Sequence, residues 1–311
     1  MAIRCALALA FCSLLSAPGG SRAQGIAAAS TNEGQFTLHF VQGEGWRPLP
    51  YTDAKGVILF RGVINARPAT FMLDNGTSRT MIDAGFARRA DIGLHLTKSQ
   101  AVTGAATKLG IGRTDALTLE AEHAFSVIGT MAAIDLSGVS ASLGQNVDAV
   151  VGADVLDHAS VMIQPGRMML SLAPSGAIKG GSGILIPIVD RNKILLQVNG
   201  APVKLALDLG STGAVRLTDT AWHRIFAGSG TTEKSDMTSA DGVRRDTLRA
   251  RAEVRLGRLT AKDVAVDSGF VSRDSADGLI GTRFLTSMTV ILDLGKAQIG
   301  FFPPATASTP H

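Results

Sequence analysis

The sequence predicts an all-β protein with a few short helices, built as two tandem homologous lobes. Short runs rich in Val, Ile and Leu, separated by Gly, Asn, Asp or Pro, dominate the chain and are typical of strands. One pattern occurs twice, at residues 65–77 (NARPATFMLDNGT) and 199–211 (NGAPVKLALDLGS): Asn, a short turn, an apolar run, then Asp-x-Gly and a hydroxyl. The copies are 134 residues apart at both the Asn and the Asp, which indicates an internal duplication.

The first stretch of the chain has the pattern of a cleaved export signal. Arg4 precedes an apolar run over residues 5–17, and a small-x-small end predicts cleavage after Ala23. This run is too short for a permanent membrane span, and no later segment offers about 18 uninterrupted apolar residues. We therefore expect residues 1–23 to be a signal peptide and the mature protein to be exported, periplasmic or secreted, without a stable membrane anchor.

Composition argues against several classes of function. Both cysteines, Cys5 and Cys12, lie in the predicted signal peptide, so the mature chain has no disulfide and no zinc-thiolate site. The six histidines have no ligand spacing, so no metal site is predicted. Five arginines between residues 244 and 255 are interrupted by Asp246 and Glu253 and have no aromatic residue among them. We expect a solvated pair of strands there and no nucleic-acid partner.

Each repeat is expected to open with paired strands and to close with a hairpin. The closing parts match as DAVVGADVL at residues 148–156 and DGLIGTRFL at residues 277–285, followed in both copies by strand, Gly-containing turn and strand. Short helices are predicted at residues 83–90 and 218–226, each with an Asp or Thr able to cap the first turn. Residues 174–183 (PSGAIKGGSG) are rich in Gly and are expected to be the linker. The first lobe is then residues 35–173 and the second lobe residues 184–304.

The Asp loops carry the candidate chemistry. An Asp directly after a buried strand, followed by x-Gly and a hydroxyl, places its carboxylate at a tight turn. A single Asp-x-Gly is an ordinary turn, but two copies at the same point of a repeat favour a two-fold site. In such a site the acids Asp74 and Asp208 would meet and share one proton.

FMLDNGTS with DAVVG, and LALDLGST with DGLIG, resemble the two signatures of retropepsin-like and pepsin-like aspartic peptidases. The resemblance covers nearly the whole mature chain and implies a bilobal pepsin/retropepsin-like acid protease fold in a tandem, single-chain arrangement. It implies that each lobe supplies one catalytic aspartate, Asp74 and Asp208, on a loop threaded beside the apolar-apolar-Gly segment. The supporting loop residues would be Gly76, Thr77, Gly210 and Ser211.

The resemblance also implies an activity. We expect an exported aspartic endopeptidase in which the two acids activate a water for attack on a peptide bond, without a metal, a cofactor or a covalent intermediate. Its partner would be a peptide or protein substrate in the cleft between the lobes, and we expect a monomer. Residues 101–117 are the candidate for a mobile flap over the first lobe, and residues 239–242 for the tip of its counterpart.

The chain departs from the family pattern at one position of each loop. The family has Thr or Ser between Asp and Gly, and its hydroxyl bonds across the axis, but this chain has Asn75 and Leu209. Asn can donate and accept, whereas the Leu side chain can do neither, so at least one of the two reciprocal contacts should be missing. A catalytically degenerate peptide-binding or scaffolding relative is therefore an alternative. A glycosidase with two separated carboxylates ranks lowest, because it does not explain the repeated turn.

Overall fold

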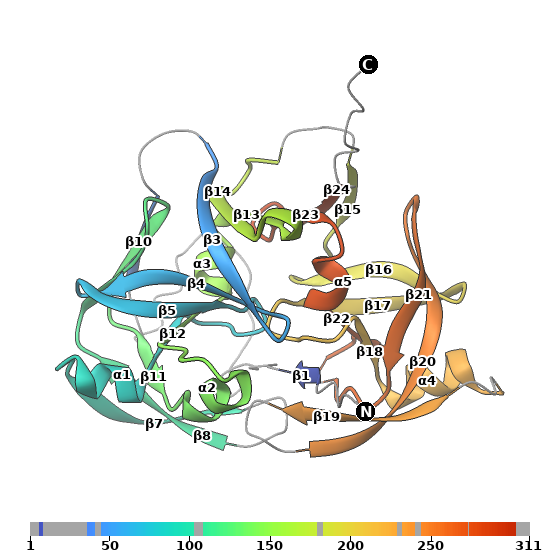
Figure 1. Ribbon diagram of the computed structural model, residues 1–311, viewed down its shortest axis with the longest axis horizontal. Helices are drawn as coiled ribbons and strands as arrows, with labels where there is room; N and C mark the ends of the chain where they lie inside the picture. The colour runs from blue at the N-terminus through green and yellow to red at the C-terminus, as the bar shows by residue number, and fades with distance from the viewer. Residues whose placement is uncertain are drawn as a thin grey trace, which may run out of the picture.

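Figure 1 shows a computed structural model of the chain, which describes residues 6–8, 36–40, 45–102, 108–178, 183–228, 232–239, 244–272 and 274–302. The protein is 56% strand and 13% helix, which confirms the predicted mostly-β fold with few helices. The helices in the described residues are short: α1 (Ala84–Arg89), α2 (Ser137–Leu143), α3 (Ala153–Leu156), α4 (Asp219–Phe226), α5 (Thr282–Leu285) and a 3-10 turn at Pro165–Arg167.

Both helices predicted from the sequence form, and each has the expected cap. Asp83 accepts a hydrogen bond of 2.7 Å from the backbone N–H of Phe86 at the start of α1. Thr218 accepts one of 3.2 Å from the N–H of Ala221 at the start of α4. These side chains satisfy backbone donors that the first helical turn leaves unpaired, and so fix where each helix begins.

The larger sheet has sixteen strands and contains most of the first half of the chain. Its main path runs in the order β15-β24-β23-β13-β14-β3-β4-β5-β12-β6-β11-β8-β7, and β9, β10 and β2 branch from β4. The strands are β2 (Phe36–Phe40), β3 (Arg47–Ala54), β4 (Val57–Ile64), β5 (Arg67–Leu73), β6 (Met81–Asp83), β7 (Leu94–Val102), β8 (Lys108–Thr114), β9 (Leu117–Ala121), β10 (Phe125–Gly129), β11 (Ala132–Ile134), β12 (Ala149–Val151), β13 (Ala159–Gln164), β14 (Met169–Pro174), β15 (Ile184–Pro187), β23 (Thr289–Asp293) and β24 (Gln298–Phe302).

The smaller sheet has eight strands, in the order β1-β19-β20-β16-β17-β22-β18-β21, and β20 also pairs with β21. It occupies the right side of Figure 1, where the long strands β20 and β21 stand out. Its strands are β1 (Ala6–Ala8), β16 (Lys193–Val198), β17 (Ala201–Asp208), β18 (Val215–Leu217), β19 (Glu233–Ser239), β20 (Arg244–Leu256), β21 (Leu259–Asp267) and β22 (Gly278–Gly281).

The two halves of the chain share the larger sheet. The hairpin β13–β14 pairs with β3 on one side and with β23 on the other, and β24 and β15 continue the path. Asp293, which is fully buried at the end of β23, accepts hydrogen bonds of 2.6 Å from the hydroxyls of Ser160 and Ser175. Strands and a buried carboxylate therefore tie the second half of the chain to the first.

Repeated residues make the same hydrogen bonds in both halves. The Asn65 side chain accepts from the N–H of Thr118 at 2.9 Å, and the Asn199 side chain accepts from the N–H of Glu253 at the same distance. Both asparagines have left-handed backbone angles, with φ of 47° and 48°. The matching sequences at these two turns therefore fold in matching ways.

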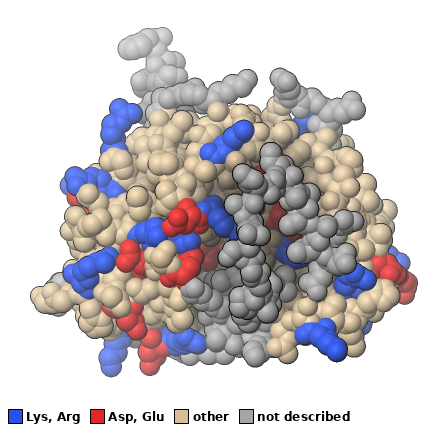
Figure 2. Space-filling view, turned by 180° about the vertical axis from the view of Figure 1, so that it is seen from behind, with Lys and Arg blue, Asp and Glu red and all other residues tan. Residues whose placement is uncertain are grey.

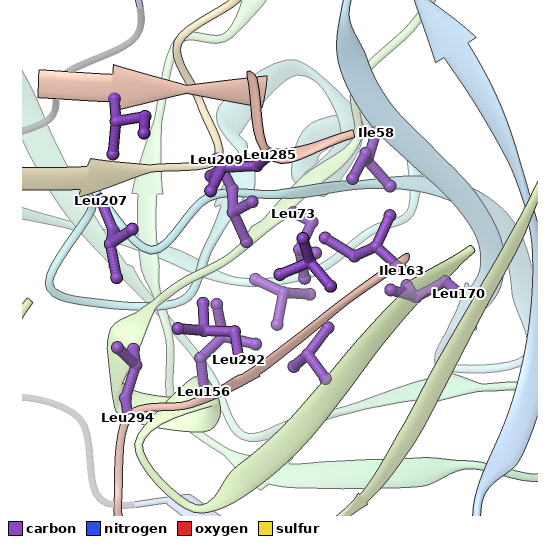
Figure 3. Packing of buried hydrophobic residues seen from close by; sticks show 14 of the residues in the cluster. Ile58, Leu73, Leu156, Ile163, Leu170, Leu207, Leu209, Leu285, Leu292 and Leu294 are labelled. Atoms are coloured by element: carbon purple, nitrogen blue, oxygen red, sulfur yellow. The ribbon is translucent and has the colours of Figure 1, made fainter. Parts of the chain in front are cut away.

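A single apolar cluster passes through both halves of the chain. Figure 3 shows Leu73 from β5, Leu207 from β17 and Leu209 from the loop after it, packed with residues of β13, β14 and β23. Burial of side chains of this size stabilises the fold by about 1.5–3 kcal/mol each. A second, smaller cluster lies under α2 and contains Leu59, Met72, Met81, Leu136, Val139, Leu143 and Val150.

Each repeat has a long hairpin between its Asp loop and its apolar-apolar-Gly segment. In the first half the hairpin is β7–β8, which includes part of the predicted flap, and in the second half it is β19–β20. Residues 103–107 of the predicted flap and residues 240–242 of the predicted second tip (239–242) lie outside the described residues, as do residues 179–182 of the predicted linker. Of the predicted signal peptide only β1 is described, and it pairs in parallel with β19.

Two arginines of β20 form ion pairs with acids of β21. Arg249 pairs with Asp267 at 2.7 Å, and Arg251 pairs with Asp263 at 3.4 Å. Figure 2 shows the same mixture on the face opposite to that of Figure 1, where Lys and Arg side chains lie next to Asp and Glu. In the parts of the chain that the structure describes, no helix is long and apolar enough to cross a membrane.

Candidate active site

The first Asp loop leaves β5 and is held by the apolar-apolar-Gly segment, as the sequence predicts. β5 pairs in parallel with β12, and the N–H of Asp74 donates to the Val151 carbonyl at 3.1 Å. Further along the loop, the carbonyl of Thr77 accepts from the N–H of Ala153 at 2.9 Å. A Cβ at Gly152 would lie 2.6 Å from the Arg79 carbonyl oxygen, so only glycine lets the two backbones pass this closely.

The second Asp loop repeats this arrangement at the end of β17. β17 pairs in parallel with β22, and Asp208 lies directly opposite Gly281. The carbonyl of Ser211 accepts from the N–H of Thr282 at 2.8 Å, as that of Thr77 does from Ala153. A Cβ at Gly281 would lie 2.5 Å from the Ser211 carbonyl oxygen. The two loops therefore have the same support in both halves of the chain.

The loops bring the two predicted acids together. A Cβ at Gly76 would lie 2.9 Å from Oδ1 of Asp208 and 3.0 Å from Oδ1 of Asp74. A Cβ at Gly210 would lie 2.6 Å from Cγ of Asp74. Each glycine thus packs its backbone against the carboxyl group of the other half, and both carboxyl groups border the same small space.

Asn75 links the two loops through its side chain. Its Nδ2 donates to the carbonyl of Leu207 at 2.9 Å, and its Oδ1 accepts from the N–H of Leu209 at 2.8 Å. The contact from the other direction is missing, as expected, because the Leu209 side chain has no polar atom. Leu209 instead packs in the apolar cluster and is 1% exposed. One side chain of the first loop therefore makes two hydrogen bonds to the backbone of the second.

The remaining loop residues act through their backbone. The N–H of Gly76 donates to Oδ1 of Asp74 at 2.8 Å, and the N–H of Gly210 donates to Oδ1 of Asp208 at 2.9 Å. The hydroxyl of Thr77 donates to the Arg79 carbonyl at 3.4 Å. The hydroxyl of Ser211 is buried and has no hydrogen-bond partner among the described residues. The backbone amides of Gly76 and Thr77 therefore orient Asp74, and those of Gly210 and Ser211 orient Asp208, whereas the two hydroxyls do not.

Burial disfavours the ionised form of both acids. Asp74 is fully buried, which raises its pKa well above the ordinary value; the nearby charge of Asp208 raises the pKa further. Burial also raises the pKa of Asp208, to about 7, while the N–H of Gly210 and the charge of Arg216 act in the opposite direction. Two such groups in one space favour a state with a single proton between them.

Sequence patterns missed two groups next to these loops. Thr80 donates to Asp154 from its N–H at 2.8 Å and from its hydroxyl at 2.7 Å, which braces the first loop. Its partner is 74 residues away, so no local pattern marks the pair. Arg216 is a single basic residue within the apolar strand β18, and that isolation is a signal that marks it in the sequence.

No group of three or more His, Cys, Asp or Glu among the described residues is placed to hold a metal ion. No family model and no curated protein matches this sequence. Function must therefore be inferred from the geometry of the two Asp loops.

Proposed function

We propose that this chain is an exported aspartic endopeptidase with two tandem retropepsin-like lobes, residues 35–173 and 184–304. The observation that carries the proposal is the meeting of Asp74 and Asp208 at Gly76, where one added carbon atom would lie about 3 Å from a carboxylate oxygen of each. The shared loop support, repeated in both halves, is what a two-fold catalytic site requires.

The chemistry follows from one proton shared by two acids. The ionised acid takes a proton from water as the water oxygen bonds to the scissile carbonyl carbon, and the neutral acid donates its proton to the carbonyl oxygen. In the second step the C–N bond breaks. The first acid then protonates the leaving nitrogen, and the second recovers a proton from a hydroxyl of the tetrahedral carbon. Both acids return to their starting states, so the cycle needs no cofactor.

Asn75 supports turnover rather than a degenerate, binding-only role. General acid–base catalysis depends on placement of the two carboxyl groups to within a fraction of an ångström. The two hydrogen bonds of Asn75 hold the backbone immediately before and after Asp208. The first loop therefore positions the second acid without help from the Leu209 side chain.

The test is hydrolysis of a diverse peptide library by the mature protein between pH 3 and pH 8. We expect internal cleavage, and loss of at least about 1,000-fold in kcat/KM on Asp74→Asn or Asp208→Asn, since each removes one role of the pair. Asp263→Asn is the matched control, because that side chain is 78% exposed and lies outside the site.

Two results would overturn the proposal. Cleavage that survives both Asn substitutions would assign hydrolysis to other groups. Binding of peptides without cleavage, in protein whose fold is shown to be intact, would favour the peptide-binding or scaffolding alternative.

A further inference from the structure

A buried arginine lies beside the second Asp loop. Arg216, in the middle of β18, is 2% exposed, and its Nε and Nη2 make no hydrogen bond with a described residue. A Cβ at Gly213 would lie 3.9 Å from Nη2, so the guanidinium lies against the backbone that follows Asp208. A buried charge without compensation is strongly destabilising, so its neighbours must balance it.

Arg216 stands at the inner end of a row of alternating charges. Its direct partner on β21 is Asp267, and the partner of Asp267 on β20 is Arg249. Directly paired residues carry their side chains on the same face of a sheet. Arg249 donates to the two carboxylate oxygens of Asp267 at 2.7 and 2.9 Å. The strands β18, β21 and β20 can be followed together on the right of Figure 1.

Asp208 lies on the other side of Arg216. On β22, Leu279 pairs with both Arg216 and Ala206, and Asp208 follows Ala206 by two residues on β17. Residues two apart on a strand share a face, so Asp208 leaves the sheet on the same face as Arg216. Burial lowers the pKa of Arg216, and the charges of Asp267 and Asp208 both oppose that effect.

The position in the first half that matches Arg216 is apolar. Val150 matches Leu279 in the repeat, and its partner on β6 is Met81, which in turn pairs with Ala132 on β11. Met81 belongs to the apolar cluster under α2. An apolar pair, Met81 and Ala132, thus stands beside Asp74 in the position that Arg216 and Asp267 take beside Asp208.

We propose that Arg216 is a positioning residue that places the single negative charge of the acid pair on Asp208 and leaves the shared proton on Asp74. This inference rests on the proposed function. Two guanidinium groups, of Arg216 and Arg249, then face two negative charges, of Asp267 and of the singly ionised pair. The catalytically competent state is therefore the one in which the buried charges balance.

Other charged groups around the pair have partners of their own. On the same sheet, Lys193 pairs with Asp274 at 2.7 Å and Lys204 pairs with Asp190 at 2.8 Å. On the side of Asp74, Asp154 is bonded to Thr80 and is attracted by Arg79. At the outer end of the row the acids Glu233 and Asp236 attract Arg249. Among these groups, Arg216 is thus the one cation whose charge acts on the acid pair.

The roles of the two acids then differ. Asp208 is the base that takes the proton from the attacking water, and Asp74 is the acid that protonates the carbonyl oxygen. When the C–N bond breaks, Asp208 returns its proton to the nitrogen and Asp74 regains one from the tetrahedral intermediate.

The direct test measures proton binding without any substrate. In protein labelled with ¹³C at the aspartate carboxyl carbon, Asp208 is observed in the Asp74→Asn variant and Asp74 in the Asp208→Asn variant. We expect Asp208 to titrate at least about one pH unit below Asp74, because only Asp208 has a cation beside it. Equal midpoints, or the reverse order, would overturn the inference.

A second test uses the acid limb of the pH profile of kcat/KM. Arg216→Met introduces the residue that the first half has at the matching position, Met81, and should move the acid limb to higher pH by about one unit. Arg216→Lys keeps the positive charge and should leave the limb near its wild-type position. Asp267→Asn should move it down, because Arg216 then acts on the pair alone. Arg216→Met combined with Asp267→Ala copies the Met81 and Ala132 pair, keeps the charge of the row, and should return the limb toward that of the wild type.

If Arg216 had only a structural role, Arg216→Met and Asp267→Asn would lower rates without moving the acid limb in opposite directions. That result would overturn the inference. The two proposals also fail separately. The expected order of titration without any peptide cleavage would contradict the proposed function and leave the charge placement standing. Peptide cleavage with an acid limb that none of the variants moves would support the proposed function and contradict the charge placement by Arg216.

Discussion

Asn75 and Leu209 join the two Asp loops through a side chain on one side and a backbone amide on the other. Oδ1 of Asn75 accepts from the N–H of Leu209 at 2.8 Å, and Nδ2 donates to the carbonyl of Leu207 at 2.9 Å. These two backbone groups flank Asp208. A residue of the first repeat therefore fixes the acid of the second, and the site depends on the two halves remaining in register.

Replacing Asn75 with Ala should weaken both the fold and catalysis. The side chain is buried, so its loss leaves two backbone groups unpaired away from water. We expect the free energy of unfolding to fall by about 2–4 kcal/mol. We expect kcat to fall by at least about 100-fold, because Asp208 loses its fixed position. Urea denaturation and peptide hydrolysis measure the two effects.

The matched control is Leu209→Met. It replaces the side chain of the residue whose backbone N–H binds Asn75, and leaves that N–H in place. Leu209 contributes its backbone N–H to the hydrogen bond and its side chain only to packing. A substitution of similar volume should cost less than about 1.5 kcal/mol and leave hydrolysis intact. Wild-type stability in Asn75→Ala would show that the two bonds do not hold the loops together.

The sequence indicated part of this link and missed the rest. It showed that Asn75 can donate and accept and that Leu209 has no polar side chain, and both statements hold. It did not show that the partners of Asn75 are backbone groups, because a pattern of residue types records side chains only. Arg216 was missed for a related reason: burial of one arginine in a strand depends on its pairing with β21 and β22, which are distant in sequence.

The sequence likewise predicted the local parts of the fold and not the pairing of distant strands. Local signals fixed the strand-rich composition and both helix starts, since the capping residues Asp83 and Thr218 act within one turn. The shared sheet was not predicted. Its pairing of β13 with β23 joins Val161 to Leu292, and alternation along a strand says which face is buried but not which distant strand lies beside it.

Substitution of Gly210 by Ala should separate the two acids. The added Cβ would lie 2.6 Å from Cγ of Asp74, closer than any real contact allows, and the neighbour is a carboxyl group held by its own loop. We expect loss of about 1–3 kcal/mol of stability from overpacking and loss of measurable hydrolysis. Thermal unfolding and peptide cleavage provide the readouts.

Gly166→Ala controls for the intrinsic effect of replacing glycine. A Cβ there meets nothing within 4 Å, and the residue is in the turn between β13 and β14. Stability should change by less than about 1 kcal/mol, with activity retained. Equal behaviour of the two variants would mean that the loops do not approach as closely as described.

Stability should fall as pH rises from about 4 to about 7 through the acid pair. Burial raises the pKa of Asp208 to about 7 and that of Asp74 well above its ordinary value. Unfolded aspartate loses its proton near pH 4, so between these limits the unfolded state binds fewer protons than the folded state. The stabilisation is complete below the unfolded pKa and is lost as pH rises through the folded pKa. Urea denaturation at several pH values measures the slope.

Removal of the titrating groups should flatten that slope. In Asp74→Asn combined with Asp208→Asn, the contribution of about 1.4 kcal/mol per unit of pKa shift disappears, while all other groups titrate as before. Asp263→Asn, at an exposed site, should keep the wild-type slope. A slope shared by all three proteins would mean that the acids ionise normally in the folded state.

The turns at Asn65 and Asn199 provide a test of the duplication itself. Each residue has a left-handed backbone and a side-chain oxygen that accepts one N–H, from Thr118 or from Glu253, at 2.9 Å. Gly at either position keeps the backbone angle and loses the hydrogen bond, so it should cost about 1 kcal/mol. Ala should cost about 1–2 kcal/mol more, because its Cβ opposes the left-handed angle. Denaturation of the four variants should give the same order, and similar sizes, in both halves; a large effect in one half alone would show that the two turns do not carry equal weight.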